Sequence, residues 1–161
     1  MLIKMGENMN KLIKFISVVL VLISANSQAQ EWNKKQTEIW NVVMASYADI
    51  DKQDINWSDK WVTADAVVWG NSNPMPRTRD SVKRWDSYRF PQSKTMISEY
   101  SPTGIVVHDS TAVAHYYYSN GAKDKEGKHK TTHGRCTDIL VKDKSGWKFV
   151  SWHCADEPSK D

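Results

Sequence analysis

The C-terminal third of the chain, from His133 to Ala155, constrains the fold more than any other segment. Two runs rich in β-forming residues flank the turn from Asp143 to Gly146, which is a strong hairpin signal. Successive residues of a strand point to opposite faces of a sheet. The second run therefore has two faces: Trp147, Phe149, Ser151, His153 and Ala155 on one, and Lys148, Val150, Trp152 and Cys154 on the other.

Both cysteines of the chain lie in this hairpin. A three-residue turn, Lys144 to Gly146, places Cys136 directly opposite Cys154 on the same face. Opposed residues in a non-hydrogen-bonded antiparallel pair lie about 4.5 Å apart at Cα, within the range of a disulfide. A register shift of one residue would put the two sulfurs on opposite faces. The sequence therefore allows a disulfide, and two buried free thiols are the alternative.

The first 29 residues have the composition of a secretory signal peptide. Lys4, Lys11 and Lys14 precede an apolar run from Phe15 to Ile23, and small residues up to Ala29 offer a cleavage site. This run is far shorter than the ~20 residues that span a bilayer. We therefore expect a periplasmic or secreted protein that is cleaved near Ala29 and has no membrane partner afterwards.

Removal of residues 1–29 changes the charge balance of the chain. The full sequence has 22 basic and 19 acidic residues, and without three lysines and Glu7 the counts become 19 and 18. A net charge of +1 gives no support to a nucleic-acid partner. Residues 30–161 have the usual length of a single domain, and no repeat or low-complexity linker divides them.

Helical and strand patterns occupy separate parts of this domain. Apolar residues recur at helical spacing from Glu31 to about Asp51, and shorter helical segments follow at 57–62 and 78–88. A short strand at 66–69 lies between them, and from Lys94 onward the pattern is that of antiparallel strands joined by turns. Three helices before long strands in meander order predict an α+β domain, with the helices covering the inner face of the sheet.

Four short motifs follow one another in a recognisable order: Asp65-Ala-Val-Val-Trp-Gly70, the Tyr116-Tyr-Tyr-Ser strand, Gly134-Arg-Cys-Thr-Asp-Ile-Leu140 and Gly146-Trp-Lys-Phe-Val-Ser-Trp-His153. This order, over residues from about 35 to 155, resembles the SnoaL-like, nuclear-transport-factor-2-like superfamily. It looks closest to a bacterial branch of unassigned function related to the association domain of calmodulin-dependent kinase II. The resemblance implies a cone-shaped, cystatin-like domain: three N-terminal helices on a curved, mostly antiparallel sheet, a pocket at one end, and commonly a homodimer built through the sheet.

Such a superfamily does not fix a function, so the site has to be argued from residues. In the ketosteroid isomerases of this superfamily, a tyrosine on the first helix donates to the forming oxyanion, and Tyr47 matches that position approximately. Their general base is an aspartate just past the first strand, where this chain has Gly70. The resemblance therefore argues against isomerase proton transfer.

The expected pocket has two sets of candidate ligand contacts. His153, Arg135 and Thr137 share the face of Trp147, which we expect to be concave, and with Tyr47 they suit a carboxylate or enolate. A hydrogen-bonded core histidine and an arginine ion pair at the rim are the alternative. The second set is aromatic and suits a small apolar or aromatic ligand at the mouth and floor, although most of its members are expected in the core: Trp57, Trp61, Trp69, Trp85 and Tyr117.

The remaining histidines suggest two kinds of site, an acid–base pair and a metal site. His115 and His133 resemble the histidines of scytalone dehydratase-like sites, where a histidine paired with an aspartate acts as acid and base. Asp65 is the nearest partner in the sequence, although a role in a turn competes. Cys136, Cys154, His133 and His153 are zinc-ligand types, but His153 and Cys154 point to opposite faces of one strand. We therefore expect no metal and no cofactor.

Together these patterns favour an exported ligand-binding or accessory protein of unassigned specificity. An enzyme of the lyase, cyclase or isomerase type, using a pocket histidine with aspartate or tyrosine, is the first alternative. A structural oligomerisation domain is the second.

Overall fold

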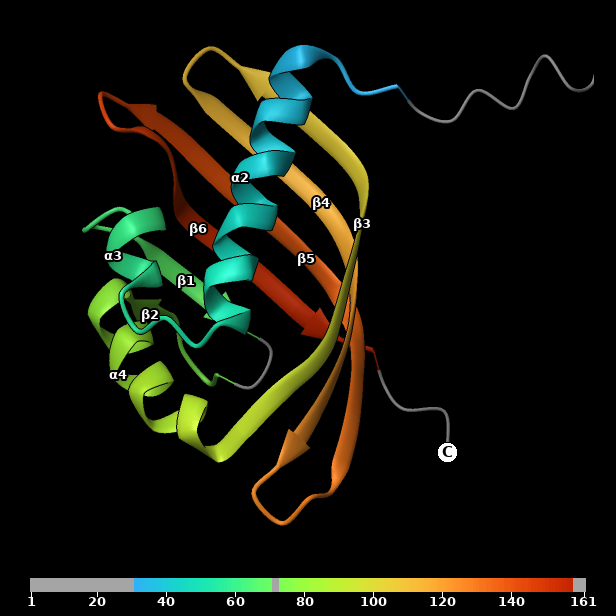
Figure 1. The fold of residues 1–161 in the computed structure, drawn as a ribbon. Coiled ribbons are helices and arrows are strands. Elements are labelled where there is room, and N and C mark those ends of the chain that lie inside the picture. Colours follow the sequence, from blue (N-terminus) through green and yellow to red (C-terminus); the bar gives the residue numbers. More distant parts are fainter. Residues whose placement is uncertain (1–30, 71–72, 158–161) are drawn as a thin grey trace, which may run out of the picture. The chain divides into compact units, whose positions relative to one another are not determined.

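A computed structural model describes residues 31–70 and 73–157 of the chain (Figure 1). The expected signal peptide and its cleavage near Ala29 lie outside the described residues. From Asn33 onward the described part forms a compact unit. Among the described residues, no helix is long and apolar enough to cross a membrane.

The helices come before the long strands, as the sequence predicts. Helix α2 covers Lys34–Asp51, α3 covers Trp57–Trp61, and α4 covers Arg79–Arg89. Two short strands, β1 (Val67–Gly70) and β2 (Arg77–Thr78), lie between α3 and α4. A 3-10 turn at Phe90–Gln92 leads into the remaining strands: β3 (Ser93–His108), β4 (Thr111–Asp124), β5 (His129–Asp143) and β6 (Gly146–Asp156).

The described strands form one six-stranded sheet in the order β2-β1-β6-β5-β4-β3. All neighbours are antiparallel except β1 and β6, which run parallel. The sheet is curved, and α2 crosses its inner face (Figure 1). The predicted α+β class, with helices packed on a curved and mostly antiparallel sheet, is confirmed.

The first turn of α2 is fixed both locally and to the sheet. The Asn33 side chain accepts hydrogen bonds from the backbone N–H groups of Lys35 and Gln36, and the Gln36 side chain accepts from the Asn33 N–H. Gln36 also donates through Nε2 to the carbonyl of Ile105 on β3, at 2.7 Å. Below this point Ile39 and Val43 are fully buried with Leu140 of the sheet, which sets the depth at which α2 lies on it.

A single extra residue changes the faces of β6. The predicted pairing holds from Gly134↔Asp156 to Ile139↔Ser151, but nearer the turn Leu140 pairs with Phe149, so Val150 forms a bulge. The turn itself is two residues long and is followed by Gly146 at φ 114°. Phe149 therefore lies on the inner face with Trp152, and the prediction that Phe149 and His153 share a face is wrong.

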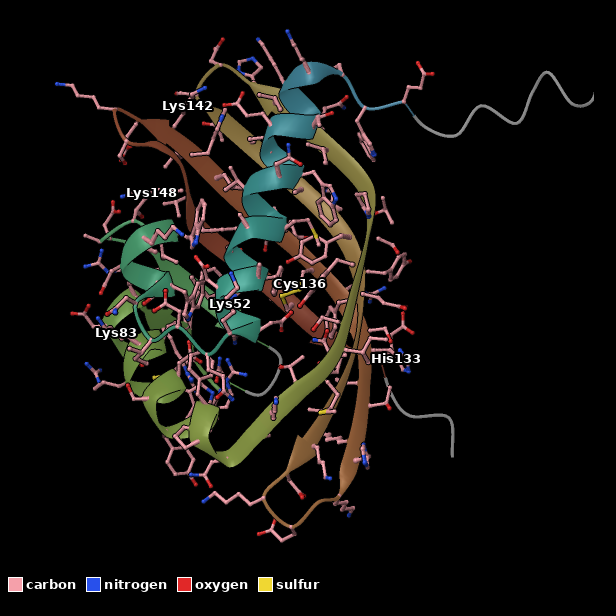
Figure 2. All side chains as sticks on the ribbon, in the orientation of Figure 1. Lys52, Lys83, His133, Cys136, Lys142 and Lys148 are labelled. Carbon is pink, nitrogen blue, oxygen red and sulfur yellow. A yellow bond between two sulfur atoms is a disulfide. The ribbon has the colours of Figure 1, made fainter. Side chains whose placement is uncertain are left out.

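Cys136 and Cys154 form the disulfide that the predicted pairing allows, with 4.1 Å between their Cα atoms. The bond joins neighbouring strands on the inner face, where Cys136 is buried (Figure 2). The alternative of two free thiols does not hold. The next pair on the same face, two residues along each strand, is Asp138 with Trp152. The bond therefore fixes the strand register next to these two residues.

Replacing both cysteines by alanine tests the contribution of this bond. A disulfide that closes a loop of 18 residues stabilises the fold by about 3 kcal/mol when it is unstrained. We expect a loss of that order or less in the free energy of unfolding, measured in urea. Reductant should lower the wild type to the level of the variant and leave the variant unchanged. Two alkylatable thiols in the unreduced wild type would contradict the bond.

Candidate functional site

A cavity of about 280 Å³ lies between α2, α4 and the inner face of the sheet. Ligand pockets commonly have volumes of about 300–1,000 Å³, so this cavity suits a molecule of one or two rings better than a larger one. Helices α2, α3 and α4 and each of the six described strands contribute to its wall. Its lining includes Tyr47, Asp51, Trp57, Val68, Arg77, Trp85, Asp86, Arg89, Ser98, Tyr100, Asp138, Phe149 and Trp152.

The apolar wall of the cavity is an aromatic corner. Trp152 has its ring centroid 6.1 Å from that of Trp57 and 6.3 Å from that of Phe149, the latter at an interplanar angle of 89°. The indole N–H of Trp57 donates to buried Asp86 at 2.8 Å, and Arg89 donates to the other oxygen of the same carboxylate at 2.9 Å. Because its N–H is held, the Trp57 ring has a fixed orientation toward the cavity.

A chain of three hydroxyl and carboxyl groups forms the inner end of the cavity. The hydroxyl oxygens of Tyr47 on α2 and Tyr116 on β4 lie 2.6 Å apart. The Tyr116 hydroxyl lies 2.9 Å from Oδ2 of Asp138 on β5. Tyr47 and Asp138 line the cavity, and Tyr116 lies fully buried behind them. The chain therefore connects the helix to two strands and presents both of its ends to the cavity.

Burial sets the protonation of this chain. Loss of solvation raises the pKa of Asp138 to about 7, while the hydrogen bond with Tyr116 acts in the opposite direction. Burial likewise raises the pKa of Tyr47 and of Tyr116 well above the ordinary value of tyrosine. Asp138 can therefore gain or lose a proton near neutral pH, whereas both tyrosines keep theirs.

The proton on Asp138 determines the direction of the hydrogen bonds, because each hydroxyl has a single proton to donate. When Asp138 is a carboxylate, Tyr116 donates to it and Tyr47 donates to Tyr116, so both exposed ends accept. When Asp138 is protonated and donates to Tyr116, Tyr116 donates to Tyr47, and the Tyr47 hydroxyl is free to donate into the cavity. The same atoms thus accept from a ligand in one state and donate to it in the other.

A second polar group lies where α2 ends. Ser98 donates to Oδ1 of Asp51 at 3.1 Å, and burial raises the pKa of this carboxyl. Tyr100 stacks on Tyr47, with 4.1 Å between the ring centroids and an interplanar angle of 23°. Tyr100 belongs to β3, so this stack ties the Tyr47 ring of α2 to the sheet, and both rings line the cavity.

Comparison with known proteins identifies the family. The family model of the SnoaL-like domain matches residues 39–155. The chain belongs to this family. Comparison with curated proteins found no match.

Solved structures agree with this SnoaL-like fold. A ketosteroid isomerase-like protein from Erwinia carotovora atroseptica has a TM-score of 0.68 and 16% identity, over 80% of this chain and all (100%) of that one. An NTF2-like protein from Cytophaga hutchinsonii has a TM-score of 0.66 and 13% identity, over 78% of this chain and 100% of that one. A candidate Ca/calmodulin-dependent kinase II association domain from Exiguobacterium sibiricum has a TM-score of 0.64 and 11% identity, over 81% of this chain and 100% of that one. Identities this low establish the fold of the SnoaL-like domain alone.

Three of the predicted aromatic and tyrosine contacts line the cavity of this SnoaL-like domain: Tyr47, Trp57 and Trp85. Trp61 instead donates to Asp49 at 2.8 Å, outside the cavity. Trp69 is 46% exposed and donates to the carbonyl of Asn73. Tyr117 alternates with buried Tyr116 along β4, so it points outward and is 51% exposed.

The predicted polar set lies together, but on the outer face. Thr137 pairs with His115 on one side and with His153 on the other, and the Nδ1 of His115 is 2.9 Å from the Thr137 hydroxyl. Arg135 follows on the same face of β5. None of these described side chains lines the cavity. The expectation of a concave position for this set is wrong because it rests on the face of Trp147 and Phe149. The bulge at Val150 puts His153 on the opposite face from Phe149, and Thr137 of β5, which opposes His153, lies there too.

The predicted histidine–aspartate dyad is not assembled. His133 lies on the outer side of the sheet, beside a shallow hollow lined by Tyr117 and Glu157 (Figure 2). Asp65 is exposed in the turn before β1. Cys136 and Cys154, the other residues considered as zinc ligands, are bonded to each other.

Tyr116 and Asp138, at the inner end of the cavity, were not predicted as site residues. A usable signal exists for Asp138, because it alternates with Cys136 and Leu140 on the apolar face of β5. A carboxylate in the middle of such a face is buried and has a perturbed pKa.

Asp138→Asn removes the titrating proton while keeping the shape and an acceptor for Tyr116. The pKa of Asp138 rises from 3.8 to about 7 on folding, so between these values the folded state binds more protons than the unfolded state. Proton binding by Asp138 therefore stabilises the fold at low pH. This contribution to the free energy of unfolding, on the order of 4 kcal/mol at most, is lost as the pH rises toward about 7. In urea unfolding, the free energy of unfolding of the variant should therefore increase relative to that of the wild type as the pH rises through this range. A difference that does not change with pH would contradict the prediction.

Proposed function

We propose that this SnoaL-like protein is an exported binding protein for a small, flat organic molecule that presents an oxygen to the inner end of the cavity. The Tyr47–Tyr116–Asp138 chain carries the proposal, because two of its members reach the cavity at 2.6 Å and 2.9 Å from a shared hydroxyl. Trp57, Phe149 and Trp152 offer broad apolar surfaces to a ring next to that chain.

The energetic cost of this arrangement supports a ligand site over a purely structural core. Asp138 is 3% exposed, and its side-chain hydrogen bond comes from a neutral hydroxyl rather than from a cation. A buried carboxylate without a cationic partner destabilises a fold, whereas an apolar residue of similar size would not. Perturbed carboxyls in cavities are typical of binding and catalytic sites.

Export is supported by two independent features. The N-terminal sequence has a basic segment, an apolar run and small residues up to Ala29. The Cys136–Cys154 disulfide is of the kind that persists in oxidising compartments such as the periplasm. N-terminal sequencing of the protein from separated periplasmic and cytoplasmic fractions tests the proposal, and a chain beginning at Met1 found in the cytoplasm alone would overturn it.

The binding proposal predicts opposite pH dependences for two matched probes, measured by isothermal titration calorimetry. 2-Naphthol donates a hydrogen bond and should bind more tightly above about pH 7, where Asp138 is a carboxylate. 2-Acetonaphthone only accepts, and it should bind more tightly below that pH. One hydrogen bond contributes about 1 kcal/mol, so we expect changes of about fivefold.

Variants test whether the Tyr47–Tyr116–Asp138 hydrogen-bond chain causes this pH dependence. Asp138→Asn should remove the pH dependence for both probes, and Tyr47→Phe should weaken 2-acetonaphthone at low pH by a similar factor. Tyr88→Phe is the matched control, because Tyr88 is exposed and does not line the cavity. If neither probe binds the folded wild type, the proposal fails.

A specific observation favours a second candidate, a lyase-, cyclase- or isomerase-type enzyme. The pKa of about 7 for Asp138 is close to the optimum for a general acid or base at neutral pH. No histidine is among the described residues that line the cavity, so this candidate relies on Asp138 with Tyr47. Exchange of the α-protons of 2-tetralone in D2O, followed by NMR, tests it. A rate equal to that of the Asp138→Asn variant would rule it out.

We also propose that the protein forms a homodimer through the outer face of the sheet. Val106, Val113 and Ile139 pair across β3, β4 and β5, and the first is 62% exposed. Tyr117 and His115 extend this surface, which is of the kind that marks interaction sites in monomers. Sedimentation equilibrium tests the proposal, and a monomer at every concentration would overturn it. A dimer whose cavity binds no probe would favour a structural oligomerisation role.

A further inference from the structure

Arg77 lies at the end of the cavity formed by β1, β2 and α4. It pairs directly with Val68 across the two short strands. Directly opposed residues of an antiparallel pair point to the same face. Val68 is buried and lines the cavity, and Arg77 lines it too. The strand pairing therefore aims the Arg77 side chain at the cavity.

The other charged groups of the cavity are already accounted for. Arg89 and Asp86 form an ion pair at 2.9 Å. Asp51 accepts from Ser98, and Asp138 is hydrogen-bonded to Tyr116. Among the described residues, Arg77 takes part in no ion pair. Its guanidinium is thus a cation that faces the cavity without a carboxylate partner in the described part of the chain.

The contact that Arg77 does make leaves its donors available. Its guanidinium carbon lies 5.0 Å from the ring centroid of Trp85, over the ring. A cation–π contact limits the motion of the guanidinium and does not require its N–H groups as hydrogen-bond donors. The N–H groups point outward in the plane of the guanidinium, where they match the two oxygens of a carboxylate.

We propose that Arg77 is an anion-binding residue and that the ligand is a small aromatic or alicyclic carboxylic acid whose carboxylate is held by Arg77. This inference rests on the binding function proposed above and adds the substrate class. The ring of the acid lies against the aromatic corner, and a hydroxyl or carbonyl at its other end meets the Tyr47–Tyr116–Asp138 chain. The cavity then discriminates an acid from its uncharged ester.

Calorimetric titration with 6-hydroxy-2-naphthoic acid, its methyl ester and 2-naphthol tests the inference. The acid and the ester share the ring system and the hydroxyl and differ in the charge offered to Arg77. We expect the wild type to bind the acid at least about tenfold more tightly than the ester, as a charge-assisted bidentate contact allows. Arg77→Gln should abolish this preference while ester affinity stays within about threefold of the wild type.

Arg84→Gln is the matched control, because Arg84 is an exposed arginine of α4 that does not line the cavity. It changes the net charge equally and should keep the full preference for the acid. Arg77→Lys tests whether the planar guanidinium is needed, because lysine keeps the positive charge but cannot make the bidentate contact. This variant should retain only part of the preference for the acid.

The outcomes separate this inference from the binding function. If the ester and 2-naphthol bind but the acid is not preferred, or if Arg77→Gln retains the preference, Arg77 does not hold a carboxylate and the binding function stands. If none of the three probes binds folded wild type, both are overturned. Circular dichroism and thermal unfolding of each variant establish that the loss is not one of fold.

Discussion

The burial of Asp138 is the constraint on which the rest of the structure depends. A carboxyl group on the inner face of a sheet is stable only when a donor reaches it, and Tyr116 on the neighbouring strand supplies that donor at 2.9 Å. The Tyr116 hydroxyl in turn meets Tyr47, which belongs to α2. Satisfying one acid therefore determines how the helix lies on the sheet, and Tyr100 stacks on Tyr47 to hold it there.

The elements of the fold follow from local patterns in the sequence, whereas the site does not. Helical spacing in α2 was predictable from periodicity. The pairing of Cys136 with Cys154 was also predicted, but from a three-residue turn, and the bulge at Val150 makes up for the turn being one residue shorter. The face of His153 was not, because one bulged residue, Val150, reverses every later side chain of β6. Thr137 does pair with His153 as the predicted register requires, yet on the outer face, where His115 lies beside them. Asp138 was missed because a buried acid contradicts the composition of its strand.

The cavity has a different chemistry at each end and in the middle. At the inner end the lining groups are neutral or near their titration point, in the middle they are aromatic, and at the β1–β2 end they include the guanidinium of Arg77. In the proposed binding mode these environments would orient an asymmetric acid, because the reverse orientation would bury its charge beside Asp138.

The position of the disulfide has a consequence for how the protein matures. Pairing β5 with β6 without the bulge would continue the register of the turn and put His153, not Cys154, opposite Cys136. The two sulfurs would then lie on opposite faces and could not bond. With the two-residue turn, only the bulged pairing, in which Trp152 lies inward beside Asp138, can be oxidised. Oxidation would then trap the strand pairing that has the cavity and leave the unbulged alternative reversible.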